Sequence, residues 1–384
     1  MSAYSVLLGG MRVALQFEIP ELEIERRKEA IRRVWQYEEV DHIPVQFQLQ
    51  LNPFGYSMRE EILDRKKQLD LRLYNIERSL SLIPDDYIPT LFINVGCVGI
   101  SEAFGCKIHW GDNPQQTPGV RGRILKGGDD IRRLTIPDLV HSSSCSEFLS
   151  RLDYFLTSTD FKIPASALDN NGITGVAMDL LGTDQFFLLM YEDPEALDIL
   201  LDRITDAILS FTEETIRVAQ GIEHLTSTDF FYLWCPEGRK GHASSDASAM
   251  YSPDFFKRFD VPYNSRVYAQ YGPGLLHNCG PNPCASVYLD HEMQISGVNL
   301  AYRYSKDDLH TFKEPFKRRG IIYLLFDNET PFEALTEYEK VMNVLAPEVI
   351  ALPVVFISDP EIDVTSLYRE FLKVSKEYAR RLWK

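Results

Sequence analysis

Short apolar runs alternate along this chain with longer segments in which apolar residues recur every three or four positions. Residues 45–49 alternate between apolar and polar side chains, as in a half-buried β-strand. Further short runs lie at 91–95, 172–176, 224–228, 274–276, 298–300, 321–326 and 349–356. This alternation predicts parallel strands joined by crossover helices.

The segments between the runs carry the start signals of amphipathic helices. Asp193-Pro194 precedes an apolar stripe with spacings of three and four, formed by Leu197, Leu201, Ile204, Ile208 and Phe211. Ser252-Pro253 and Asp363 indicate two further helix starts, since each places a capping side chain ahead of an apolar stripe. Pro20 precedes a charged helix predicted over residues 21–39.

About eight strand–helix units fit in 384 residues, which favours an α/β fold of the (β/α)8 TIM-barrel type over an open doubly wound sheet. No Gly-x-Gly-x-x-Gly follows the first strand, which disfavours a dinucleotide-binding domain. We predict an N-terminal helical extension over residues 1–40 and a barrel over 41–384. A glycine- and proline-rich excursion at about 97–140 is predicted to help cover the barrel mouth.

The acidic charge argues against two classes of partner. The formal net charge is −16, whereas nucleic acids and anionic membrane surfaces attract an excess of Lys and Arg. Six widely spaced cysteines are too few for a disulfide scaffold, which favours a reducing, cytoplasmic location. Residues 1–8 lack the features of a signal peptide, and no stretch approaches about 18 apolar residues, so we expect no membrane span.

The most informative local motif is His277-x-Cys279-Gly280, which directly follows the run at 274–276. If that run is a barrel strand, both side chains leave its carboxyl end on the same side, where barrel active sites lie. Imidazole and thiolate together suit zinc, and Gly280 would let the chain turn close beside them. A half-buried histidine near a buried free cysteine is the alternative interpretation of these residues alone.

Catalytic zinc usually has three protein ligands and one open position. Candidates for the third ligand are Asp229, Cys235, Glu237, His242, Asp246 and Cys284. Asp229, Asp246 and Glu237 are also candidates for acid–base catalysis. Asp229 ends an apolar run, and the polar segment 237–246 is typical of a loop that contacts substrate. Capping or solvated roles for these residues stay open.

Substrate contacts are predicted from the same region. The aromatic residues that directly follow Asp229 would form the walls of an apolar pocket for a flat substrate. Packing in the core is the usual role of such side chains. The predicted substrate-binding residues are Phe230, Tyr232, Trp234, Arg239, His242 and Asn278.

Several segments, taken in order, make the sequence similar to the uroporphyrinogen decarboxylase-like superfamily. That superfamily includes the decarboxylase itself and corrinoid-linked methyltransferases of anaerobes. The similar segments extend over most of the chain: Glu25-Arg26-Arg27 through Pro44, Glu102-Ala103-Phe104-Gly105-Cys106, Ile136-Pro137-Asp138, Asp246-Ala247-Ser248 through Pro253 and Phe256, Val261-Pro262-Tyr263, and His277-Asn278-Cys279-Gly280.

The resemblance implies methyl transfer more than decarboxylation. The decarboxylase carries an arginine-rich loop after its first strand, whereas residues 48–53 contain no arginine. In the methyltransferases the zinc motif is His-x-Cys with a distant second Cys. His277 and Cys279 match the first half, but the last strand has no Cys. The implied reaction is a Zn²⁺-assisted transfer of a methyl group from a small donor, such as a methoxylated aromatic, to a corrinoid (cobalamin) carried by a partner protein.

Two other functions stay open at this point. One is a metal-free decarboxylase or lyase of the same superfamily, which would act on a small carboxylic acid with Arg239, Lys240 and Asp246. The other is a binding protein that keeps the barrel without catalysis. A homodimer is compatible with either, since many barrels dimerise.

Overall fold

The computed structural model of the chain describes residues 17–84 and 86–384. The expectation for residues 1–8 and the first part of the predicted 1–40 extension lie outside the described residues. The later part of that extension contains helix α1, Glu21–Trp35.

Six parallel strands form the main sheet in the order β1, β8, β7, β6, β5, β4. Their bounds are Gln46–Leu49 for β1, His242–Ser244 for β4, Leu275–Asn278 for β5, Gly297–Ala301 for β6, Ile321–Phe326 for β7 and Ile350–Ile357 for β8. Strands β1, β5, β6, β7 and β8 confirm five of the predicted runs. Strand β7 is buried along its whole length, and β8 along nearly all of it, as expected of strands covered on both faces.

Short extended segments continue the sheet into a barrel. Parallel bridges join Leu91 to Ala165 and Ala165 to Leu225. The remaining gaps are crossed by backbone hydrogen bonds from Asp86 N to Val45 O and from Thr228 N to Lys240 O. The fold is therefore a TIM-type α/β barrel, which confirms the predicted class.

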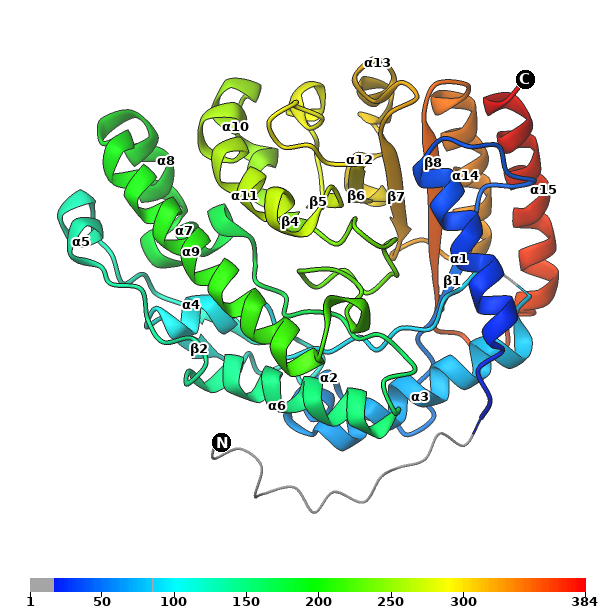
Figure 1. The fold of residues 1–384 in the computed structure, drawn as a ribbon, viewed down its shortest axis with the longest axis horizontal. Helices are drawn as coiled ribbons and strands as arrows, with labels where there is room; N and C mark the ends of the chain where they lie inside the picture. The colour runs from blue at the N-terminus through cyan, green and yellow to red at the C-terminus, as the bar shows by residue number, and fades with distance from the viewer. Residues whose placement is uncertain (1–16, 85) are drawn as a thin grey trace.

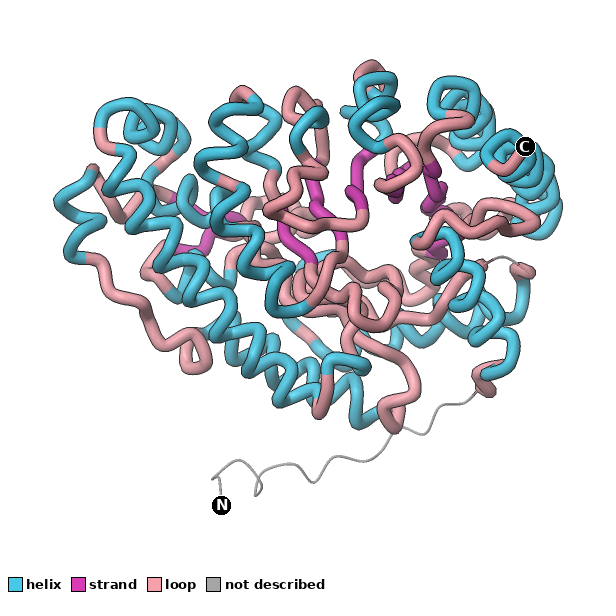
Figure 2. The backbone as a smooth tube through the Cα atoms, turned by 45° about the horizontal axis from the view of Figure 1, so that its top comes forward, coloured by secondary structure: helices cyan, strands magenta, loops and turns pink. Residues whose placement is uncertain are grey.

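Helices surround the strands (Figure 2). Their bounds are Met58–Leu63 for α2, Arg65–Leu82 for α3, Gly99–Ala103 for α4, Gly128–Arg133 for α5, Ser143–Ser158 for α6, Ile173–Leu181 for α7, Thr183–Glu192 for α8, Pro194–Ala219 for α9, Pro253–Phe259 for α10, Val261–Tyr271 for α11, Tyr302–Ser305 for α12, Lys313–Phe316 for α13, Pro331–Leu345 for α14 and Val364–Leu382 for α15. Helix α1, in blue, is drawn in front of β8 in Figure 1, and Trp383 after α15 donates from Nε1 to Tyr37 O just after α1, so the two ends of the described chain meet.

The predicted helix starts are confirmed by their capping bonds. The side chain of Asp193 accepts from Ala196 N at the start of α9, and the side chain of Asp363 accepts from Ser366 N at the start of α15. Ser252 caps α10 in the same way. Each bond satisfies a backbone N–H that the first turn of a helix leaves without a partner.

The strand predicted at 172–176 is wrong, because these residues begin helix α7. Buried apolar side chains continue through α7 at helical spacing, and a short apolar run cannot by itself distinguish a strand from a buried helix. The barrel position is taken instead by the extended segment around Ala165.

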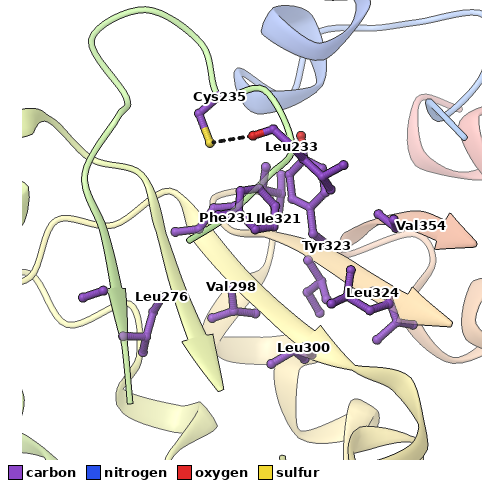
Figure 3. Packing of buried hydrophobic residues seen from close by; sticks show 14 of the residues in the cluster. Phe231, Leu233, Cys235, Leu276, Val298, Leu300, Ile321, Tyr323, Leu324 and Val354 are labelled. Atoms are coloured by element: carbon purple, nitrogen blue, oxygen red, sulfur yellow. Dashed lines mark hydrogen bonds between the residues drawn. The ribbon is translucent and has the colours of Figure 1, made fainter. Parts of the chain in front are cut away.

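The barrel interior is filled partly by a loop, not only by strand side chains. Residues 229–241 connect the Leu225 segment to β4, and Phe231, Leu233 and Cys235 of this loop pack near Ile321, Tyr323 and Val354 (Figure 3). The ring of Phe231 meets that of Tyr323 edge-on with centroids 5.4 Å apart. The loop thereby supplies apolar side chains that a barrel of this width needs at its centre.

Helix α1 covers the amino ends of the strands. Trp35 Nε1 donates to Tyr323 Oη at 3.0 Å, and Tyr37 Oη donates to Gly320 O just before β7. These bonds hold the base of the barrel closed, so the mouth at the carboxyl ends is the face left for a site.

Residues 97–140 contain α4, α5 and a two-stranded antiparallel sheet formed by β2, Lys107–His109, and β3, Gly119–Arg121. This hairpin pairs with no strand of the main sheet among the described residues. Its role as a cover for the mouth stays a prediction. Within the described part of the chain, no single helix is long and apolar enough to cross a membrane; only α7 and α8 together meet that test, across a 103° bend.

Candidate metal centre

His277 and Cys279 lie side by side at the carboxyl end of β5. His277 Nε2 is 3.3 Å from Cys279 Sγ, so the two side chains turn to the same side as the motif predicts. Gly280 follows with φ +106°, and a Cβ at this position would come within 2.6 Å of Ser305 Oγ. The close turn after Cys279 therefore requires glycine, as the sequence suggested.

Asp246 brings a third donor from the end of the neighbouring strand β4. Its Oδ1 accepts a hydrogen bond from Cys279 N at 2.6 Å and lies 3.7 Å from His277 Nε2. One ligand atom from each of Asp246, His277 and Cys279 falls within 4.8 Å of the others. Parallel pairing of β4 and β5, with Ser244 opposite His277, places the residues after both strands at one edge.

Asn299 on β6 orients the imidazole. His277 Nδ1 and Asn299 Oδ1 are 2.7 Å apart, while Asn299 Nδ2 donates to Tyr323 O at 3.4 Å. Because the amide oxygen can only accept, Nδ1 must carry the proton, and Nε2 presents its lone pair to Cys279 and Asp246. A metal-binding histidine is typically held in this way by a hydrogen bond at its other nitrogen.

In the absence of a cation, the Cys279 side chain is a protonated thiol. Burial, followed by the negative charge of Asp246, raises the pKa of the Cys279 thiol to about 12. A cation held by these groups would reverse the effect of the surrounding negative charge and favour the thiolate. Cation binding should therefore release a proton.

Two further acidic residues lie near the centre and differ in role. Asp229 is fully buried and accepts hydrogen bonds from Asn170 N, Phe230 N and Ser244 Oγ, so it ties three segments together. Asp169 follows the extended segment at Ala165. Burial, then the charge of Asp229, raises the pKa of Asp169 to about 7.

Asp169 was missed by the sequence analysis because the strand was assigned at 172–176. The signal that could have identified it is the apolar run at 163–168, which ends directly before this carboxylate.

Aromatic rings enclose the histidines. Phe230 meets the His277 ring edge-on at 5.1 Å and the His242 ring at 5.5 Å. The sequence predicts His242 in a loop, but the residue lies in strand β4, where its ring stacks on that of Phe231. Burial lowers the pKa of His242, although Asp229 at 3.5 Å opposes this, so the ring is neutral. Phe230 is therefore the predicted aromatic in direct contact with the proposed ligands.

The segment 237–246 is divided between the two ends of the barrel. Residues 237–241 precede β4 and lie at the amino ends of the strands, where Arg239 Nη1 donates to Ser296 Oγ and Glu237 pairs with Arg32 of α1. Trp234 also lies there, beneath the cationic groups of Arg32 and Lys240. The structure therefore does not bring Glu237, Arg239 or Trp234 to the centre, because the loop after Asp229 returns through the barrel before β4 begins.

Asn278 points away from the proposed ligands. Its Nδ2 donates to Tyr288 Oη at 2.7 Å, and its Oδ1 accepts from Gly280 N at 2.9 Å, so it shapes the turn after β5. The other cysteines proposed as third ligand are buried elsewhere: Cys235 contacts Leu233 O and Cys284 contacts Tyr251 O.

Comparison with known proteins places the chain in a family. The chain is similar to a methyltransferase from Methanosarcina mazei of known structure, with a TM-score of 0.64 and 18% sequence identity over 93% of this chain and 99% of that one. At this identity the likeness concerns the fold. No curated protein sequence matches the chain. The family model described as uroporphyrinogen decarboxylase (URO-D) matches residues 26–308, which is most of the sequence. The chain therefore belongs to the uroporphyrinogen decarboxylase family.

Proposed function

We propose that this protein transfers a methyl group from a small methylated donor, such as a methoxylated aromatic, to the corrinoid of a partner protein, with zinc held by Asp246, His277 and Cys279. The observation that carries the proposal is the convergence of these three donors within 4.8 Å at the barrel mouth. The similarity in fold to a methyltransferase supports the reaction type.

The residues fit zinc in both donor chemistry and number. Nitrogen, sulfur and carboxylate oxygen are all ordinary zinc ligands, and three protein ligands leave one position for substrate. Asn299 already fixes the tautomer that His277 needs to bind a metal through Nε2. The last strand has no cysteine, and Asp246 from the neighbouring strand β4 is our candidate for the missing third ligand.

In the proposed reaction the methyl group leaves the donor oxygen. The C–O bond would break, and the partner's corrinoid, as the methyl acceptor, would supply the electron pair for the new bond from its cobalt(I), which would become cobalt(III). The C–O bonding pair stays on the oxygen, which then takes up a proton. A bound Zn²⁺ would polarise that oxygen as a Lewis acid.

The remaining roles fall to residues of this chain. Phe230 and the walls around His277 would exclude water from the reacting bond, which strengthens local electrostatic interactions. Burial and the charge of Asp229 raise the pKa of Asp169, and its carboxyl group lies within the electrostatic influence of His277 and Asp246, so Asp169 is our candidate for the group that gives the leaving oxygen its proton.

The alternative decarboxylase or lyase needed Arg239, Lys240 and Asp246 in one site. Arg239 lies at the amino ends of the strands with Ser296, whereas Asp246 follows the carboxyl end of β4. Lys240 is buried and donates to Leu225 O. This separation favours methyl transfer over that alternative.

Metal analysis of the purified protein tests the proposal. We expect about one zinc per chain, and its loss in a His277→Ala/Cys279→Ala double variant and in Asp246→Asn. His291→Ala is the matched control, since His291 is exposed and is not among the three converging donors. With cob(I)alamin and a neutral methoxyarene, zinc-loaded protein should form methylcobalamin. The absorption spectrum of the cobalamin measures this conversion. Unchanged zinc content in the double variant, or full transfer by metal-free protein, would contradict the proposal.

A further inference from the structure

A small cavity lies among the carboxyl ends of the strands. It has a volume of about 90 Å³ and lies between the end of β1, helix α3, the segment after Leu91, and β8. Ligand pockets for whole drug-sized molecules measure roughly 300–1,000 Å³, so this cavity has room for one functional group of a small ligand. Its lining includes Gln48, Arg72, Thr90, Phe92, Tyr232 and Phe356.

Arg72 is the one charged side chain among the described residues that line this cavity. It is 20% exposed and is anchored by two bonds, from Nε to Phe92 O at 3.2 Å and from Nη2 to Glu61 at 3.3 Å. A guanidinium has five N–H donors in a planar fork, so this anchored side chain keeps donors for a further acceptor. Glu61 pairs with Arg72 but does not line the cavity, so the guanidinium is the charged group that a ligand would meet.

Gln48 adds an unused donor to the same cavity. Its Nε2 is buried and has no hydrogen-bond partner among the described residues. A buried amide N–H without an acceptor costs about 1–3 kcal/mol, so an acceptor brought by a ligand would relieve a penalty already present in the free protein. Arg72 and Gln48 therefore both favour a ligand rich in acceptor oxygens.

The remaining walls suit a flat, apolar body. The rings of Phe92 and Tyr232 meet edge-on at 5.4 Å, and those of Tyr232 and Phe356 at 6.1 Å. Tyr232 is two residues from Phe230, which contacts His277. Two residues of chain extend at most about 7 Å, so the same short segment borders both the cavity and the metal centre.

We propose that Arg72 and Gln48 bind a carboxylate of the methyl donor, so that the donor is a small acid with its methylated group directed to the metal centre. This inference rests on the proposed function for the identity of the donor, but the carboxylate site itself does not. A planar guanidinium matches the two oxygens of a carboxylate, and charge-assisted hydrogen bonds of this kind are stronger than neutral ones.

Binding of benzoate, measured by isothermal titration calorimetry, tests the site without any methyl transfer. Benzamide, which has the same shape and no charge, is the comparison ligand. We expect benzoate to bind wild type more tightly than benzamide does, and Arg72→Gln to weaken benzoate by about 10- to 100-fold while leaving benzamide nearly unchanged. Arg78→Gln on the exposed side of α3 is the matched control.

Gln48→Ala keeps Arg72 and its anchors, and should weaken benzoate by a smaller factor, about 3- to 10-fold. Gln48→Ala serves as the second test of the site if Arg72→Gln lowers the midpoint temperature of thermal unfolding and so affects the fold. The inference is overturned if wild type binds benzoate no better than benzamide, or if neither variant changes benzoate affinity. His277→Ala should still bind benzoate, because the carboxylate site does not use His277. If the wild-type protein bound benzoate through Arg72 but held no zinc and transferred no methyl group, the proposed function would be disproved and this site would stand.

Discussion

Replacing Asn299 with leucine should weaken zinc binding while the barrel stays folded. The substitution removes the acceptor that lies 2.7 Å from His277 Nδ1, and with it the bond that fixes the tautomer of the ring. Loss of such an outer hydrogen bond typically lowers metal affinity 10- to 100-fold, which corresponds to about 1.4–2.8 kcal/mol. Asn299→Asp should act in the opposite direction, since a carboxylate is a better acceptor and makes the ring a more basic ligand.

Competition with a chromophoric zinc chelator at fixed pH measures these affinities. Asn264→Leu is the matched control, because Asn264 is also buried but lies on α11, away from the imidazole. Circular dichroism of the metal-free proteins checks that each variant folds. Equal zinc affinity in Asn299→Leu and wild type would refute the argument that Asn299 prepares His277 for a metal.

Two further predictions concern stability. Phe231→Ala should lower the free energy of unfolding by about 3–5 kcal/mol in denaturant titrations, because this fully buried ring packs on His242 and Tyr323. A change below about 1 kcal/mol would disprove its core role. Phe332→Ala is the control, since Phe332 is exposed. Burial lowers the pKa of Lys240 to about 8 from its ordinary 10.5, so the folded protein binds fewer protons between these values and gains stability as pH rises through them. The unfolding free energy of wild type relative to Lys240→Met should therefore rise by about 2–3 kcal/mol between pH 7 and 10, and a difference independent of pH would contradict the shift.

Much of the barrel could be predicted from the alternation of apolar runs and capped helices. Asp193, Ser252 and Asp363 cap helices where the sequence predicts, because a capping bond forms within three residues and needs no distant partner. The run at 172–176 was misassigned for the converse reason: its burial on α7 depends on packing against other helices, and the local pattern suits helix and strand equally.

The pairing of His277 with Cys279 was likewise encoded locally. The two residues are separated by one position at the end of a strand, and backbone geometry alone directs both side chains to the same side. The close turn at Gly280 belongs to the same short segment. The sequence by itself thus determined the fold class, the helix starts and the first two donors of the candidate metal centre.

Tertiary structure alone decided the rest. Asp246 became the third donor, among six candidates, because β4 pairs with β5 in a register that the sequence does not display. Arg72 reaches the mouth from α3, a helix about 200 residues before β5 in the chain. Glu237 lies at the opposite end, because the loop after Asp229 crosses the barrel interior before β4 begins. Contacts between residues far apart in the chain depend on how the whole core packs, so short-range patterns specify the elements but not which distant side chains meet.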